Sequence, residues 1–64
     1  MTEVPNRIKE IRIKKKLTQE QLAEKVGISK YHLNRLENGH RSLTAPMAAR
    51  IAEALGKGIR DIFL

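Results

Sequence analysis

The chain has 64 residues, enough for one small domain, and a domain of this size buries only about 60% of the surface that its unfolded chain exposes. It contains no cysteine, which excludes disulfide bonds and thiolate metal sites and fits an intracellular setting. Its 13 Lys and Arg residues against 7 Asp and Glu residues give a net charge of +6, so its surface is either simply solvated or attractive to a polyanion such as nucleic acid.

Proline, glycine and short polar residues divide the chain into five short helices, so we predict an all-α fold. The first helix is expected from about residues 4–6 to Lys15, with Pro5 in its first turn, where a missing N–H costs no hydrogen bond. The lysines at 14–16 place cations at the negative end of the helix dipole. Its inner side is expected to carry Ile8, Ile11 and Arg12.

The next two helices are joined by a tight turn. Thr18 and Gln21 match a capping box that starts the second helix, and Gly27 is expected to end it with a positive φ. Ser29 can cap a third helix that runs to about residues 37–38. Helices this short cannot bury themselves, so the pair must pack on other helices and present its second member outward, as in a helix-turn-helix. One-face spacing marks the apolar side of the pair: Leu22, Ala23, Val26, Ile28, Leu33 and Leu36.

Two more helices follow the loop at 40–43. Gly39 is expected to terminate the third helix, and Thr44 can cap a fourth helix that has Pro46 in its first turn and stops at Gly56. A last short turn of helix begins at Gly58. The expected buried face of the fourth helix is Ala48, Ile51, Ala52 and Leu55. The last turn carries apolar residues that we interpret as core or as part of a weak contact between two copies: Ile59, Ile62, Phe63 and Leu64.

The outward face of the third helix carries side chains suited to the edges of DNA bases. Lys30 and Arg35 can donate to O6 and N7 of guanine, and Asn34 can pair with N6 and N7 of adenine. Tyr31 can touch a thymine methyl group or a phosphate. The alternative is a solvated surface helix, on which these residue types are ordinary.

Helix N-termini supply candidate phosphate contacts. Gln19 and Ser29 lie at the starts of the second and third helices, where exposed N–H groups and the dipole favour an anion. For Gln19 the alternative is a capping or surface role. Three residues after the third helix can also hold the DNA backbone: Arg41, Ser42 and Thr44.

Arg12 and Glu37 each lie near the apolar side of a helix, an unusual place for a charge. If the first and third helices touch, the two can form a partly buried, bidentate ion pair. Such a pair fixes geometry more surely than it adds stability.

Catalysis, metals and membranes find no support in the sequence. His32 and His40 lie on different elements, with no thiol or carboxylate at metal-ligand spacing. No Ser-His-Asp set, Gly-rich phosphate loop or close carboxylate pair is evident, and 64 residues leave little room for a water-excluding pocket. No apolar run approaches the roughly 20 residues of a membrane span, and the N-terminus lacks the order of a secretion signal. We therefore expect no enzyme activity, cofactor, metal, small-molecule ligand or membrane partner.

Three segments together resemble the Cro/repressor-type helix-turn-helix family, the lambda-repressor-like DNA-binding domains of phage and bacterial regulators. They are RIKEIR at 7–12, LTQEQLAEKVGISKYHLNRLENG at 17–39 and RIAEALGKGIRDIF at 50–63. The resemblance covers almost the whole chain. The sequence departs from the family in the fourth helix, which has alanines where bulkier aliphatic residues are usual: Ala45, Ala48 and Ala49.

The resemblance implies one five-helix domain over 1–64, with the helix-turn-helix at about 19–38 and the third helix in the major groove. It implies that Lys30, Tyr31 and Arg35 read bases and that Gln19 holds a phosphate. It also implies that Arg12 and Glu37 pair. Symmetric dimers on a palindromic operator and control of transcription, most simply by repression, are the expected outcome, with the dimer weak until DNA strengthens it.

Other functions on the same scaffold stay open. An antitoxin of a toxin–antitoxin pair would bind both DNA and a toxin, and a protein-interaction module would not read DNA. The cationic and amide side chains of the third helix argue against the module. A membrane-surface helix is disfavoured because no helix combines a broad aromatic apolar face with a lysine-rich one. A cytoplasmic protein associated with the nucleoid through DNA is expected.

Overall fold

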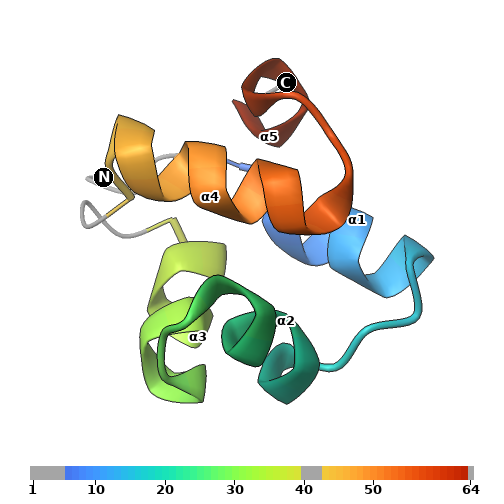
Figure 1. Cartoon of the computed structure of the whole chain (residues 1–64), viewed down its shortest axis with the longest axis vertical. Helices are drawn as coiled ribbons and strands as arrows, with labels where there is room; N and C mark the ends of the chain where they lie inside the picture. Colours follow the sequence, from blue (N-terminus) through green and yellow to red (C-terminus); the bar gives the residue numbers. More distant parts are fainter. Residues whose placement is uncertain (1–5, 40–42, 64) are drawn as a thin grey trace.

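A computed structural model describes residues 6–39 and 43–63. Within these ranges the chain forms five helices and no strand: α1 (Ile8–Lys14), α2 (Gln19–Val26), α3 (Lys30–Glu37), α4 (Ala45–Leu55) and α5 (Ile59–Phe63) (Figure 1). The predicted all-α, five-helix architecture is therefore confirmed. None of these helices has the length and apolar character needed to cross a membrane.

The helices are arranged around α4. It packs against α1, α2 and α5, while α2 also packs against α3. Figure 1 shows α4 crossing the molecule, with α5 on one side of it and α2 and α3 on the other. Helices of 5 to 11 residues are marginal alone in water, so the shared core must hold them. Its largest fully buried side chains come from all five helices: Ile8, Leu22, Leu33, Leu36, Ile51 and Ile62.

The start of α1 is held by the side chain of Asn6. Helix α1 begins at Ile8, later than expected, and Pro5 lies outside the described residues. The Asn6 Oδ1 atom accepts from the backbone N–H of Ile8 over 3.1 Å, while its Nδ2 donates to the carbonyl oxygen of Leu36 over 2.8 Å. Asn6 thereby caps α1 and joins its start to α3.

The end of α1 contains a strained residue. The N–H of Leu17 donates to the Arg12 carbonyl over 3.1 Å, and the N–H of Lys16 donates to the Ile13 carbonyl over 2.9 Å. This pair of bonds is a Schellman motif, which places Lys16 in the left-handed region at φ 60°, a position usually held by glycine. Within the described residues, Lys16 alone has a positive φ without being glycine.

Helix α2 has the expected caps at both of its ends. Both bonds of the Thr18–Gln21 capping box form, and Gly27 ends α2 with φ 86°. The carbonyl that Val26 leaves free at the end of α2 accepts from the Arg50 guanidinium of α4. A Cβ atom on Gly27 would lie 3.3 Å from Arg50 Nη2, so the turn and α4 approach closely.

Helices α4 and α5 complete the core. Thr44 caps α4 by accepting from the Met47 N–H over 3.3 Å, as expected. Of the three alanines that depart from the family pattern, only Ala48 is buried, so Ala45 and Ala49 do not affect the core. At the other end of the chain, the N–H of Arg7 donates to the Ile62 carbonyl over 2.7 Å and joins α5 to the start of α1.

One expected dimer contact is wrong. Ile62 is 0% exposed and belongs to the core, because α5 turns that side chain onto the helices beneath it. Ile59 and Phe63 remain 39% and 42% exposed on α5. Leu64 lies outside the described residues. The exposed apolar part of α5 is therefore smaller than the sequence suggested.

Replacing the strained lysine should stabilise the domain. A left-handed conformation costs a residue with a Cβ atom about 1–2 kcal/mol, and glycine avoids this cost. Glycine also loses more conformational entropy on folding than lysine does, which offsets part of the gain. We expect Lys16→Gly to raise the free energy of unfolding by about 0.5–1 kcal/mol in urea titrations. The matched control is Lys15→Gly, where φ is −85° and no strain is relieved, so stability should fall. A loss of stability in Lys16→Gly as large as that in the control would contradict this account.

Candidate nucleic-acid interface

The outer side of α3 carries the four residues expected to read bases. Lys30, Tyr31, Asn34 and Arg35 are all exposed, whereas Leu33 and Leu36 on the inner side are fully buried. The burial of the two leucines fixes the rotation of α3, so the four polar side chains share one solvent-facing surface.

Two of these side chains contact each other. The Arg35 guanidinium lies 5.9 Å from the centroid of the Tyr31 ring, and its Nη1 donates to the Tyr31 hydroxyl over 3.5 Å. Residues four apart are neighbours on a helix surface, and a cation over an aromatic face is attracted to it. Tyr31 is 69% exposed, so this contact orders Arg35 without burying it.

A second pair on α3 was missed by sequence reasoning. Asn38 Nδ2 donates to Asn34 Oδ1 over 3.2 Å. The signal that could have revealed it is the spacing of four between two amide side chains, which can hydrogen-bond on a helix surface. Asn38 thus adjoins the exposed outer side of α3.

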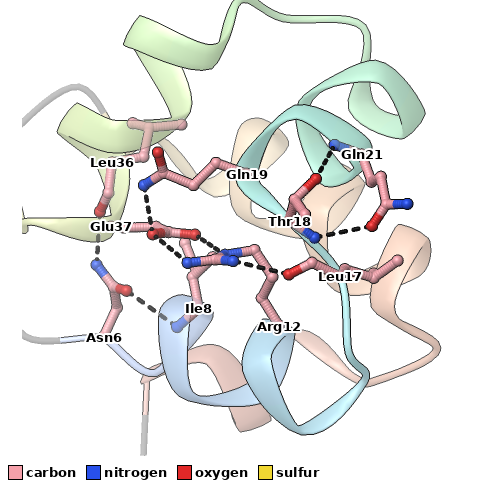
Figure 2. A network of polar contacts seen from close by, with 9 residues as sticks. All are labelled: Asn6, Ile8, Arg12, Leu17, Thr18, Gln19, Gln21, Leu36 and Glu37. Atoms are coloured by element: carbon pink, nitrogen blue, oxygen red, sulfur yellow. Dashed lines mark hydrogen bonds and ion pairs between the residues drawn. The ribbon is translucent and has the colours of Figure 1, made fainter.

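Beneath this surface, a polar network joins three helices (Figure 2). Arg12 Nε and Nη2 donate to the Glu37 carboxylate over 2.6 and 3.3 Å, and Arg12 Nη1 donates to the Leu17 carbonyl over 2.7 Å. The two charged side chains are only 9% and 1% exposed. The ion pair inferred from charges on apolar helix faces is therefore present, and it is bidentate.

Gln19 belongs to the same network. Its Nε2 donates to Glu37 Oε1 over 2.9 Å, so the first residue of α2 contacts the last residue of α3 (Figure 2). The sequence suggested a phosphate contact or a capping role, and neither includes this bond. A primary amide has a second N–H and an acceptor oxygen. Because Gln19 is only partly buried, those groups are available at the start of α2.

The other phosphate candidates lie at helix starts or outside the described residues. Ser29 caps α3 by accepting from the His32 N–H over 3.0 Å, which leaves its own hydroxyl proton free to donate. Ser29 and Thr44 are both exposed. Arg41 and Ser42 fall in the range 40–42, which is not described.

Within the ranges 6–39 and 43–63, no group of three or more histidine, cysteine, aspartate or glutamate side chains could hold a metal ion. His32 is half-buried near the start of α3, and His40 lies outside the described residues.

Comparison with known proteins places this arrangement in a family. A family model described as helix-turn-helix matches residues 8–62. An uncharacterized HTH-type transcriptional regulator of Methanothermobacter thermautotrophicus is 47% identical over 58 residues, covering 89% of this chain and 84% of the relative.

Solved structures give the same result. The restriction-modification controller protein C.AhdI from Aeromonas hydrophila aligns with a TM-score of 0.80 and 31% identity, covering 86% of this chain and 83% of that protein. SinR, a master regulator for biofilm formation solved in complex with DNA, aligns with a TM-score of 0.76 and 27% identity, covering 84% and 87%. The chain belongs to the Cro/C1-type helix-turn-helix family. It is a DNA-binding transcriptional regulator rather than an enzyme.

Removing one partner of the buried ion pair should destabilise the domain. Glu37→Ala leaves Arg12 without its carboxylate, and we expect a loss of about 3 kcal/mol in the free energy of unfolding, measured in urea. Glu20→Ala removes one exposed carboxylate from α2 and serves as the control, with little expected change. In Arg12→Met/Glu37→Leu no buried charge is left unpaired, so much of the loss should be recovered. An unchanged midpoint for Glu37→Ala would contradict this role.

Proposed function

We propose that this protein is a sequence-specific repressor that binds a palindromic operator as a dimer. The observation that carries the proposal is the outer face of α3. Its four polar side chains are exposed together, its start is capped by Ser29, and its last residue, Glu37, is fixed by Arg12 and Gln19. A short helix with such a face has the size and chemistry to enter the major groove.

In this proposal, base reading is shared along α3. Arg35 donates two parallel hydrogen bonds to O6 and N7 of guanine, and its contact with Tyr31 reduces the side-chain freedom lost on binding. Lys30 donates to guanine as a single charge, and Asn34 pairs with adenine. Tyr31 lies against a thymine methyl group or a phosphate of the same site.

Phosphate contacts set the register. Gln19 and Ser29 lie at the N-termini of α2 and α3, where free N–H groups and the dipole favour an anion. We propose that Gln19 uses its second N–H for a phosphate while the first remains on Glu37. Thr44 at the start of α4, together with Arg41 and Ser42, would hold the backbone after α3.

Two-fold pairing gives repression a structural basis. The exposed Ile59 and Phe63 on α5 offer a small apolar contact for a second copy. A contact of this size is weak, so dimers form mainly on DNA, where binding of the first copy raises the effective concentration for the second. A pair of domains on an operator excludes other proteins from it. This activity would take place in the cytoplasm, on the nucleoid.

Base and phosphate contacts should differ in their mutational effects. With an operator obtained by selecting bound duplexes from a random pool, Arg35→Ala should weaken binding by about 1–3 kcal/mol and relax specificity at one base pair. Gln19→Ala should weaken operator and scrambled duplex more evenly. Fluorescence anisotropy at fixed salt measures both, with exposed Glu24→Ala on α2 as a control outside the proposed contacts. Equal affinity of the parent for operator and scrambled duplex would refute specific regulation.

The dimer contact has its own test. Phe63→Ser removes half of the exposed apolar pair, so association at high protein concentration in sedimentation experiments should decrease. Cooperative binding to the full palindrome should decrease with it, while affinity for a single half-site stays unchanged. Ile13→Ser is the control, because Ile13 is equally apolar and 54% exposed but lies on α1. A parent that stays monomeric at high concentration and binds the full palindrome without cooperativity would contradict the dimer.

A further inference from the structure

We propose that the protein has a second anion site, a groove between α1 and α5 that binds the phosphates of an oligophosphate chain. The groove is open and has a volume of about 300 Å³. None of its lining residues belongs to α2 or α3, and α4 separates α5 from those helices (Figure 1). Its lining consists of Arg7, Ile11, Lys14, Lys15, Lys57 and Asp61.

The charges around the groove are unbalanced. Four of its lining residues are cationic and one is anionic. Glu10, beside them, is already engaged by Arg7 at 3.0 Å and by Lys14 at 3.6 Å. The hydrogen bond from Arg7 and then its charge hold the pKa of Glu10 below the usual value, so this carboxylate stays ionised. Even with Glu10 included, four cations face two carboxylates.

Two of the cations have no carboxylate partner among the described residues. Across residues 6–39 and 43–63, neither Lys15 nor Lys57 takes part in an ion pair. Lys15 lies at the C-cap of α1 and Lys57 follows Gly56 after α4, so two separate elements bring them to one groove. A concave surface with an excess of one charge sign concentrates its field and attracts counter-ions of opposite sign. A bound anion would also relieve the repulsion between the lysines.

The chemistry of the groove favours phosphate groups in series. Lysine ammonium groups bind phosphate as point charges, and Arg7 adds a planar donor. Several cations spaced around a groove match an anion that carries several charges, rather than one carboxylate. The volume is at the lower limit for small-ligand sites. Both a free oligophosphate and the backbone of a nucleic acid supply such a row of phosphates.

Inorganic tripolyphosphate is the first probe. Titrated into the ¹⁵N-labelled chain, it should shift the amide signals of Lys15 and Lys57 at lower concentrations than those of α3. A charge a few ångströms from an anion contributes about 1 kcal/mol in water, so removing two should weaken binding at least tenfold. We expect this of Lys15→Gln/Lys57→Gln. The control Lys9→Gln/Lys25→Gln has the same net charge, and its substituted residues are exposed outside the groove, so its affinity should change less than twofold.

A second arm identifies the source of the phosphates. Protein bound to an immobilised operator duplex is offered a labelled second duplex of unrelated sequence. Capture that is lost in the groove variant and retained in the control assigns the groove to a nucleic-acid backbone. If the parent protein captures no second duplex but still binds tripolyphosphate, the groove is assigned to a free oligophosphate.

The proposal is independent of operator recognition. The two double variants lose the same charge, so their affinities for operator should decrease equally. If α3 does not read bases, only the operator measurements on the α3 variants will show it, and the tripolyphosphate result will stand unchanged. Equal weakening of tripolyphosphate binding in both double variants would overturn the groove site. Signals shifted evenly over all exposed lysines would overturn it as well.

Discussion

The carboxylate of Glu37 is the point on which the geometry of the helix-turn-helix depends. It lies at the end of α3, where the helix dipole is unfavourable to a negative charge, and its side chain is only 1% exposed. A buried carboxylate in that position must be surrounded by donors. Arg12 and Gln19 provide them, one from α1 and one from the start of α2. Because Arg12 also donates to the Leu17 carbonyl, the connection between α1 and α2 is held by the same group of atoms.

This arrangement separates orientation from recognition. The leucines of α3 and the Glu37 network determine where the helix lies, while its exposed side chains take no part in the core. The exposed side chains that we propose read bases can therefore be replaced without removing a contact that holds the helix in place. Gln19 is the exception, because one amide has both a core partner and an exposed position. A change at Gln19 acts on the scaffold and the surface together.

The sequence predicted those features that depend on near neighbours in the chain. The Thr18 and Ser29 caps, the left-handed Gly27 and the inward leucines all follow from local spacing. Two local features, the left-handed Lys16 and the Asn34–Asn38 bond, were missed because helix ends and a spacing of four permit them without requiring them. Other features that were missed or misjudged depend on distant partners. Arg50 meets Val26, 24 positions away, and Ile62 enters a core made by other helices. The Arg12–Glu37 pair could be predicted although its members lie 25 positions apart in the chain, because a charge on an apolar helix face requires a partner.

The bond from the Arg7 N–H to the Ile62 carbonyl has a mechanical consequence. If α5 swings outward, it must either break this bond or pull the beginning of α1 with it. Helix α1 carries Arg12, whose guanidinium grips the end of α3. Helix α5 is thus connected to α3 through α1, by one backbone hydrogen bond and one ion pair. Displacing α5 would therefore act first on the start of α1, and on α3 only through Arg12 and Glu37.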